Sequence, residues 1–116
     1  MNHPEAWCLE TIQVGCQVYT QSQAIAIMRH SSSQDKTYSL FSQLVAAKLN
    51  VNCKHSNSSC IAAQIAAADQ WLCDHPVGSG VTANSAAWQQ IKSTYFALEK
   101  YNTGKLCAPS CRSTTQ

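Results

Sequence analysis

Apolar and polar positions alternate on both sides of a glycine near the start of the chain. Ile12 and Val14 precede Gly15 in the stretch LETIQVGCQVY, and Val18 follows it. This alternation is typical of two short antiparallel strands joined by a tight turn. We therefore predict a small β-hairpin over about residues 9–19.

Four later segments carry apolar residues every three or four positions, a spacing that predicts amphipathic helices. The predicted helices span about residues 21–30, 35–50, 59–74 and 84–101. Short helices joined by short loops favour an antiparallel, bundle-like packing. The predicted fold class is mainly α: four short helices in a bundle-like packing with a small N-terminal β-hairpin. We expect one disulfide-stapled domain over residues 1–116, with a stapled C-terminal tail.

Residues with capping preferences support the predicted helix starts. Thr20, with Gln23 three residues later, forms a capping-box signal for the first helix. Asp35 is a suitable N-cap for the second helix, and Ser58 or Ser59 is suitable for the third.

The aromatic residues divide into a predicted core and a predicted surface. Trp88 and Tyr95 share the apolar stripe of the last helix, so we expect them in the core. Phe96 lies off that stripe and is the better candidate for an exposed contact. Three others could form a platform for a carbohydrate or a partner: Trp7, Trp71 and Tyr101.

Composition favours an extracellular protein. Charged residues make up only 12% of the chain, so Ser, Thr, Gln and Asn must supply most of its polar surface. The formal net charge is +2 and the basic residues are scattered singly, which argues against nucleic-acid binding. No apolar run is long enough to span a membrane. Asn-His-Pro-Glu directly follows Met1 where a signal peptide would continue, so we expect the mature form of a secreted protein.

Seven cysteines in 116 residues favour an oxidising compartment. Six of them form three close pairs along the chain: Cys8 with Cys16, Cys53 with Cys60, and Cys107 with Cys111. Bonding within these local pairs is the simplest assignment, although spacing alone leaves the connectivity open. Cys73 is then the odd or free thiol, either buried, bonded outside the chain, or exchanged into a bond with Cys107 or Cys111.

The stretch CKHSNSSC, residues 53–60, admits three interpretations. One is a zinc site, for which the chain offers soft ligands: Cys53, His55, Cys60, Cys73 and His75. The spacing of Cys53 and Cys60 does not match the C-x2-4-C pattern of structural zinc sites, so no metal is expected. The sequence contains no C-x-x-C, which argues against thiol redox chemistry, and no cofactor is predicted. The third interpretation is a stapled surface loop, with Asn57 in a glycosylation sequon.

No arrangement of residues predicts a catalytic site. The carboxylates show no spacing suited to paired acid–base work. Cys73 and His75 could form a dyad, but side chains two residues apart at a helix end diverge. The sequence holds no nucleophile elbow and no glycine-rich phosphate loop. We therefore expect a protein without enzymatic activity.

Three stretches in the first half of the chain form a set of motifs: NHPEAW at 2–7, VGCQVYTQSQAIAIM at 14–28 and LFSQLVAAKLNV at 40–51. Together they resemble a domain of secreted bacterial and fungal proteins that carries Asn-His-Pro-Glu-x-Trp and Gln-Leu-Val-Ala-Ala-Lys-Leu-Asn motifs. The resemblance implies an extracellular setting and no known catalytic residues. This chain lacks the Gly-Tyr/Phe-Trp-Lys element that usually precedes the first motif. Its higher cysteine content points to the fungal side of the family.

The fungal side of this resemblance gives the function that we expect. The combination of motifs and cysteines is similar to that of sweet-tasting fungal proteins, which implies a secreted, non-enzymatic protein acting through surface contacts. Its partner would be a macromolecule, most specifically a sweet-taste receptor that exposed lysines and arginines contact. Two alternatives stay open. One is an extracellular structural, adhesive or carbohydrate-binding module, and the other is a small hydrolase or metal-binding protein.

Overall fold

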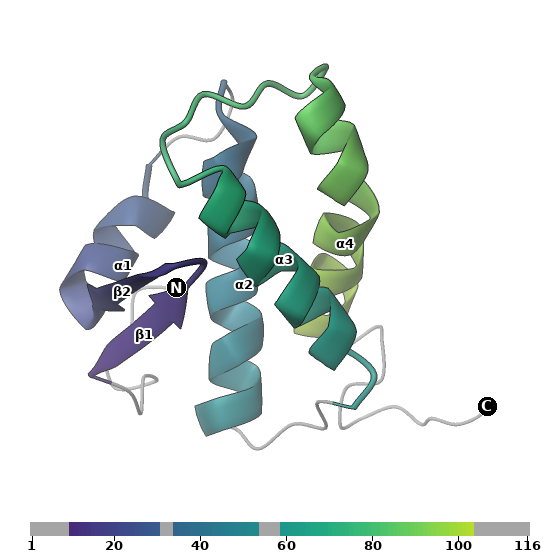
Figure 1. The fold of residues 1–116 in the computed structure, drawn as a ribbon. Coiled ribbons are helices and arrows are strands. Elements are labelled where there is room, and N and C mark those ends of the chain that lie inside the picture. The colour runs from purple at the N-terminus through teal and green to yellow at the C-terminus, as the bar shows by residue number, and fades with distance from the viewer. Residues whose placement is uncertain (1–9, 31–33, 54–58, 104–116) are drawn as a thin grey trace.

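The computed structural model describes residues 10–30, 34–53 and 59–103. In these residues it contains a two-stranded hairpin followed by four helices (Figure 1). The elements are β1 Thr11–Val14, β2 Gln17–Thr20, α1 Gln21–Met28, α2 Lys36–Cys53, α3 Ala62–Asp74 and α4 Ala86–Asn102. The predicted fold class, mainly α with an N-terminal β-hairpin, is confirmed.

β1 and β2 pair as an antiparallel hairpin with Gly15 and Cys16 at its turn. Gly15 has a φ of +65°, a conformation that residues with a side chain rarely adopt. A Cβ atom at this position would also lie 3.0 Å from the backbone carbonyl carbon of Leu72 in α3. Glycine therefore meets two needs here, the tight turn and the close approach of that turn to α3.

Side chains fix the start of α1, whereas packing fixes the start of α3. Thr20 and Gln23 form the predicted capping box, in which the Thr20 hydroxyl accepts the Gln23 N–H and the Gln23 side chain accepts the Thr20 N–H. The predicted serine cap of α3 is wrong, because the helix begins later and its N-cap is Ile61, without a side-chain hydrogen bond. The Ile61 side chain is fully buried and anchors this end of α3 in the core.

α2 continues to Cys53, beyond its predicted end near residue 50. Asparagine disfavours helix interiors because its side chain competes for main-chain hydrogen bonds, but here both asparagines have partners. Asn52 Nδ2 donates to the Lys48 carbonyl oxygen one turn back, over 2.8 Å. Asn50 Nδ2 donates to Asn102 Oδ1 of α4 over 3.0 Å. The second bond also links α2 to the end of α4.

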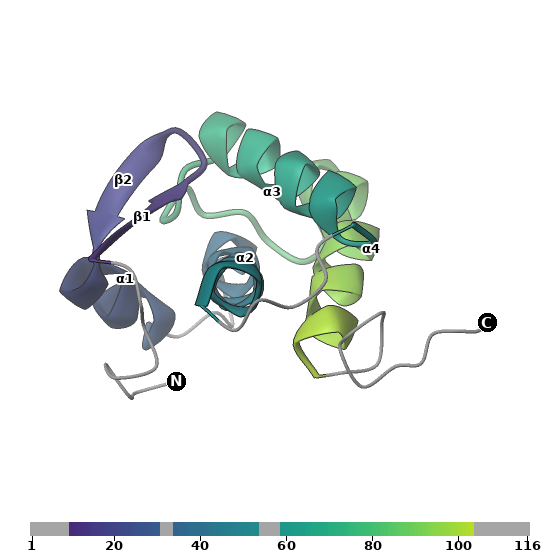
Figure 2. The same cartoon turned by 90° about the horizontal axis from the view of Figure 1, so that it is seen from below.

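α2 lies at the centre of the molecule. In Figures 1 and 2 the hairpin and α1 lie on one side of α2, and α3 and α4 cover its other side. Tyr19 of the hairpin packs edge-on against Phe41 of α2, with ring centroids 5.2 Å apart. The fully buried side chains of α2 form the middle of the core: Thr37, Leu40, Phe41, Leu44, Val45 and Ala47. One core therefore holds the hairpin and all four helices together.

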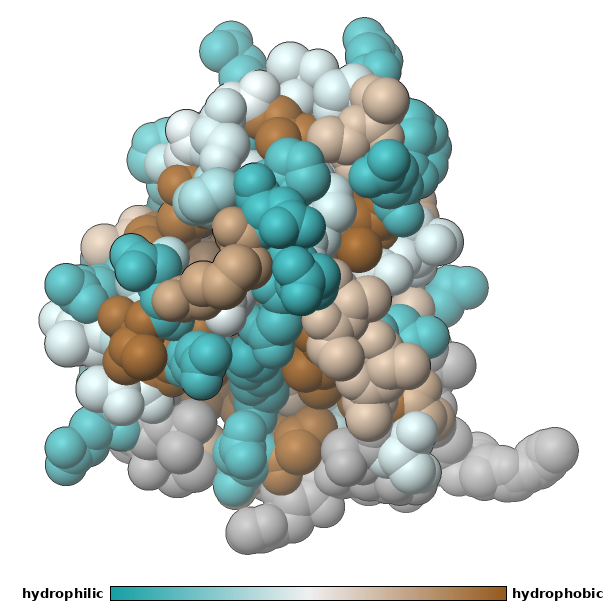
Figure 3. Space-filling view, viewed as in Figure 1, coloured by the Kyte–Doolittle hydropathy of each residue, from teal (hydrophilic) through white to brown (hydrophobic). Residues whose placement is uncertain are grey.

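The face seen in Figure 3 is largely polar, with apolar areas separated by hydrophilic side chains. A pale apolar area over α3 reflects its exposed alanines: Ala62, Ala63, Ala66 and Ala67. Two large apolar side chains in the described residues are exposed, Val18 at 66% and Phe96 at 47%. No helix in this part of the chain is long and apolar enough to cross a membrane.

Candidate functional site

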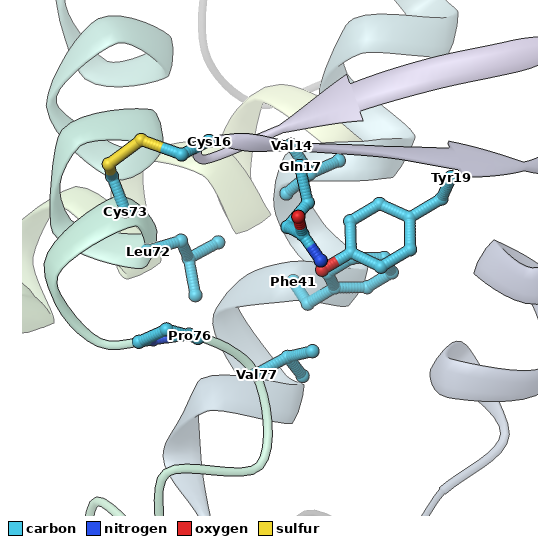
Figure 4. A pocket seen from close by; sticks show the side chains of 9 residues that line it. All are labelled: Val14, Cys16, Gln17, Tyr19, Phe41, Leu72, Cys73, Pro76 and Val77. Atoms are coloured by element: carbon cyan, nitrogen blue, oxygen red, sulfur yellow. A yellow bond between two sulfur atoms is a disulfide. The ribbon is translucent and has the colours of Figure 1, made fainter.

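The turn of the hairpin is bonded covalently to α3. Cys16 and Cys73, 57 positions apart in sequence, form a disulfide with their Cα atoms 4.8 Å apart (Figure 4). The predicted bond between Cys8 and Cys16 and the predicted odd thiol at Cys73 are therefore both wrong. The reason is spatial, because the hairpin turn packs against the last part of α3 and brings Cys16 to Cys73.

The remaining predicted site residues fall into two groups. Cys53 and Cys60 are disulfide-bonded. Six others lie outside the described residues: Trp7, Cys8, His55, Asn57, Cys107 and Cys111. The roles assigned to those six therefore stay predictions.

A charged pair holds the hairpin turn as well. Lys48 Nζ of α2 lies 2.8 Å from Asp69 Oδ2 and 2.9 Å from Asp69 Oδ1 of α3. Asp69 Oδ1 also accepts the Gly15 N–H over 2.8 Å. The Lys48 and Asp69 side chains are only 14% and 29% exposed, so water screens this pair less than it screens a surface salt bridge. We call the Cys16–Cys73 disulfide, the hydrogen bond from Gly15 to Asp69 and the Lys48–Asp69 pair the hairpin joint.

A second joint fastens the loop between α3 and α4 to the start of α2. The Asp35 carboxylate accepts the Thr37 N–H over 3.0 Å and the Thr37 hydroxyl over 2.6 Å. It also accepts the N–H groups of Gly80 and Val81, over 3.0 Å and 3.2 Å. The buried Thr37 hydroxyl accepts the Gly78 N–H over 2.9 Å. We call this set of hydrogen bonds the loop joint.

The loop joint changes the acidity of Asp35. Burial by itself would raise the pKa of this carboxyl group. The hydrogen bonds from Thr37, Gly80 and Val81 act in the opposite direction because they favour the charged form, and they lower the pKa below its ordinary value of 3.8. Asp35 therefore remains ionised, and keeps its loop contacts, in mildly acidic solution.

An open pocket of about 350 Å³ lies between β1, α2 and α3, beside the Lys48–Asp69 pair. Ile12, Val51 and Ile65 form its apolar wall, and polar side chains complete the lining. The full lining is Thr11, Ile12, Gln13, Lys48, Val51, Asn52, Ile65 and Asp69. We call this space the hairpin pocket. Its volume and mixed lining are typical of sites for small molecules.

A smaller pocket lies on the core-facing side of the hairpin, next to the disulfide. Figure 4 shows its walls, which come from the hairpin, Phe41 of α2, the end of α3 and the segment that follows α3. Its volume of about 30 Å³ has room for only about one or two water molecules. This pocket is therefore too small for an organic ligand.

The exposure of the aromatic side chains confirms only part of the predicted division into core and surface residues. Phe96 is exposed, as predicted, and Trp88 is buried in the core, as predicted. Trp71 and Tyr101 are only 5% and 2% exposed, so neither can serve as a surface platform. Trp71 faces inward because its indole Nε1 donates to the Ala87 carbonyl oxygen of α4 over 3.0 Å.

The described residues do not gather a metal-binding cluster. Within residues 10–30, 34–53 and 59–103, no three His, Cys, Asp or Glu side chains lie where they could hold a metal ion. Because Cys73 is bonded to Cys16, it can neither ligate zinc as a free thiolate nor form a dyad with His75. The His75 ring instead stacks on Trp71, with centroids 4.4 Å apart.

The outer face of α4 carries a row of exposed side chains. Lys92, Phe96 and Lys100 are all exposed and follow one another at intervals of four residues. Residues four apart lie on successive turns of the same helix face. Tyr95 packs edge-on against Phe96, with centroids 5.3 Å apart, and supports the exposed ring from one side. We call Lys92, Phe96 and Lys100 the basic–aromatic row, which sequence reasoning missed although the four-residue spacing could have predicted it.

Comparisons with protein-family models, with characterised proteins and with solved structures found no match to this chain. The family resemblance of the N-terminal motifs therefore stays a prediction. The function has to be argued from the disulfide, the hairpin pocket and the basic–aromatic row.

Proposed function

We propose that this is a secreted, non-enzymatic fungal protein that acts through contacts of its folded surface, most specifically a sweet-tasting protein that binds a taste receptor. The basic–aromatic row of α4 carries the proposal. Aromatic rings are frequent hot spots of protein interfaces, and flanking charges guide the encounter with a partner of opposite charge. In this proposal Phe96 enters an apolar site on the receptor while Lys92 and Lys100 meet carboxylates.

The Cys16–Cys73 disulfide supports the extracellular setting. Stable disulfides are typical of secreted proteins and rare in the cytosol, where thiols are kept reduced. Cys53 and Cys60 are bonded as well. The cysteine-rich form of the N-terminal motifs supports a fungal source, since it resembles the sweet-tasting protein of a truffle-type fungus.

Hydrogen bonds at both ends of α4 support recognition by a preformed surface. The Ser85 hydroxyl caps the helix by accepting the Trp88 N–H over 3.2 Å. At its other end Asn102 Nδ2 donates to Gln43 Oε1 of α2 over 2.7 Å. A surface that is already ordered loses little conformational freedom on binding, which favours affinity.

A receptor assay tests the proposal. Cells expressing the sweet-taste receptor receive the purified, oxidised protein, with another sweet protein as positive control. We expect dose-dependent activation, and we expect Phe96→Ala and the double variant Lys92→Ala/Lys100→Ala each to lower potency about tenfold. Arg29→Ala is the matched control, because Arg29 is an exposed cation at the end of α1.

Two results would count against the proposal. Absence of activation at doses where other sweet proteins act would refute receptor binding. Activation with unchanged potency in the variants of the basic–aromatic row would refute the assigned surface but would still support receptor binding.

A further inference from the structure

The hairpin pocket is held open by the same contacts that form the hairpin joint. β1 supplies one wall, the second half of α2 another, and α3 the third. The Cys16–Cys73 disulfide and the Lys48–Asp69 pair fasten these elements to one another. Because the walls are fixed without a ligand, a ligand would not have to order them. At about 350 Å³ the pocket lies near the lower end of small-molecule sites, which suits a single ring.

The charges in this pocket are already balanced. An ammonium group has three N–H donors, and those of Lys48 go to the two oxygens of Asp69 and to the Gln13 carbonyl oxygen. Lys48 therefore has no donor left for an anion. Asp69 gives little attraction to a cation, because Lys48 neutralises its charge. The pocket consequently favours a neutral ligand.

The remaining polar atoms of the pocket can both donate and accept. Asn52 uses one N–H for the Lys48 carbonyl oxygen and keeps its second N–H and its own carbonyl oxygen. The Thr11 hydroxyl has no hydrogen-bond partner in the described part of the chain, and Asp69 Oδ2 accepts only from Lys48 there. Hydroxyl groups suit such a lining, because each one both donates and accepts a hydrogen bond.

We propose that the hairpin pocket binds one neutral sugar ring, either as a free sugar or at the end of a glycan. The C–H face of the ring lies on Val51 and Ile65, and its hydroxyls bond to Thr11, Asn52 and Asp69. This site is separate from the proposed receptor surface, since no described residue of α4 lines the pocket. Either proposal can therefore fail without the other.

An extended peptide fits this pocket less well, although a strand edge borders it. The hydrogen bond from the Gln21 N–H to the Glu10 carbonyl oxygen fixes the pairing of the hairpin, so the main-chain groups of Thr11 and Gln13 point outward. An added peptide strand would need those outward groups. Lys48 Nζ already donates a hydrogen bond to the Gln13 carbonyl oxygen. This bond interrupts the series of main-chain hydrogen bonds that a peptide strand would form.

An NMR titration of the full, oxidised chain tests the sugar site. The ¹⁵N-labelled protein is titrated with methyl glycosides of glucose, galactose, mannose and N-acetylglucosamine. Because the pocket is open and the ligand small, we expect a dissociation constant in the millimolar range. Saturable shifts are expected at the amides of Thr11, Asn52 and Ile65. A trisaccharide of each sugar that binds then separates the two sources, since tighter binding of the trisaccharide indicates a glycan end and equal binding a free sugar.

Variants assign the binding to the pocket. Ile65→Trp fills the space and should abolish the saturable shifts. Asn52→Ala changes an exposed side chain that is not needed for the core, and should weaken binding about tenfold by removing ligand hydrogen bonds. If Ile65→Trp does not fold, the titration of Asn52→Ala alone tests whether the sugar binds in the hairpin pocket. Asn84→Ala is the matched control, because Asn84 is also exposed but does not line the pocket, and it should leave the titration unchanged.

The proposal would be overturned by any of three results. The first is the absence of saturable shifts with every glycoside well above the millimolar range. The second is binding whose shifts cluster away from the pocket. The third is unchanged binding by the folded Asn52→Ala variant.

Discussion

The hairpin joint and the loop joint solve the same problem with different chemistry. Each fastens a segment without helical structure to a helix far away in the sequence. The hairpin joint uses a covalent bond between Cys16 and Cys73 together with the Lys48–Asp69 pair. The loop joint uses one carboxylate, that of Asp35, as the acceptor for four hydrogen bonds.

This difference in chemistry predicts which solution conditions weaken each joint. A disulfide stabilises mainly by restricting the unfolded chain, and acid does not break it. A carboxylate stabilises the folded state only while it is ionised, so its contribution depends on pH. The disulfide of the hairpin joint should therefore resist acid and yield to reducing agents, whereas the loop joint should resist reducing agents and weaken in acid.

The largest effect is expected from removing the disulfide with the double variant Cys16→Ser/Cys73→Ser. For a bond that closes a loop of 57 residues, the chain-entropy estimate is a loss of about 4 kcal/mol in the free energy of unfolding. Urea denaturation measures this loss. The Lys48–Asp69 pair should keep the hairpin docked in the folded variant, so the Gly15 amide, which donates to Asp69, should stay protected from hydrogen exchange. A stability equal to that of the wild type would contradict the assigned bond.

The next largest effect is expected from Asp35→Ala. This change leaves the N–H groups of Gly80 and Val81 without their acceptor and should cost about 2–3 kcal/mol. Thermal unfolding measures the loss. Asp74→Ala is the matched control, because among the described residues the Asp74 carboxylate accepts only long hydrogen bonds of 3.4 Å from Gln70. Equal losses in the two variants would show that the loop joint contributes nothing specific.

Gly15→Ala should cost about 1–2 kcal/mol, because the positive φ and the contact with Leu72 both oppose a side chain. Gly80→Ala is an informative control. Gly80 also has a positive φ, of +82°, but a Cβ atom there would meet nothing within 4 Å. Urea denaturation should therefore give a larger loss for Gly15→Ala, and a larger loss for Gly80→Ala would contradict the close docking of the hairpin turn.

The smallest effect concerns pH. The folded state lowers the pKa of Asp35, so the loop joint stabilises fully above the ordinary pKa of 3.8 and loses its effect as the pH falls through the lowered value. Below about pH 4 the wild type should thus lose more stability per pH unit than Asp35→Asn, which has no charge to lose. Urea denaturation between neutral and acidic pH measures the two slopes, and parallel slopes would contradict the role of Asp35.

The parts of the fold set by local pattern were predictable from the sequence. Alternation around Gly15 predicted the hairpin, and the three-four spacing predicted all four helices. The capping box of Thr20 and Gln23 was also predictable, because its two partners lie within one helical turn.

Contacts between distant segments were not predictable in the same way. Cys16 has Cys8 as its near neighbour in sequence, yet the packing of the hairpin turn on α3 selects Cys73. The pairing of Lys48 with Asp69 depends on the crossing of α2 and α3, which no local spacing encodes. The hairpin pocket was missed for the same reason, since three separate elements line it.

Disulfide mapping of the native protein tests the account most directly. Cleavage after Glu10 separates Cys8 from Cys16, and cleavage before Asp69 separates Cys60 from Cys73. Mass spectrometry of the unreduced peptides should then find the peptide of Cys16 linked to that of Cys73. A link from Cys16 to Cys8, or a free thiol at Cys73, would contradict the hairpin joint.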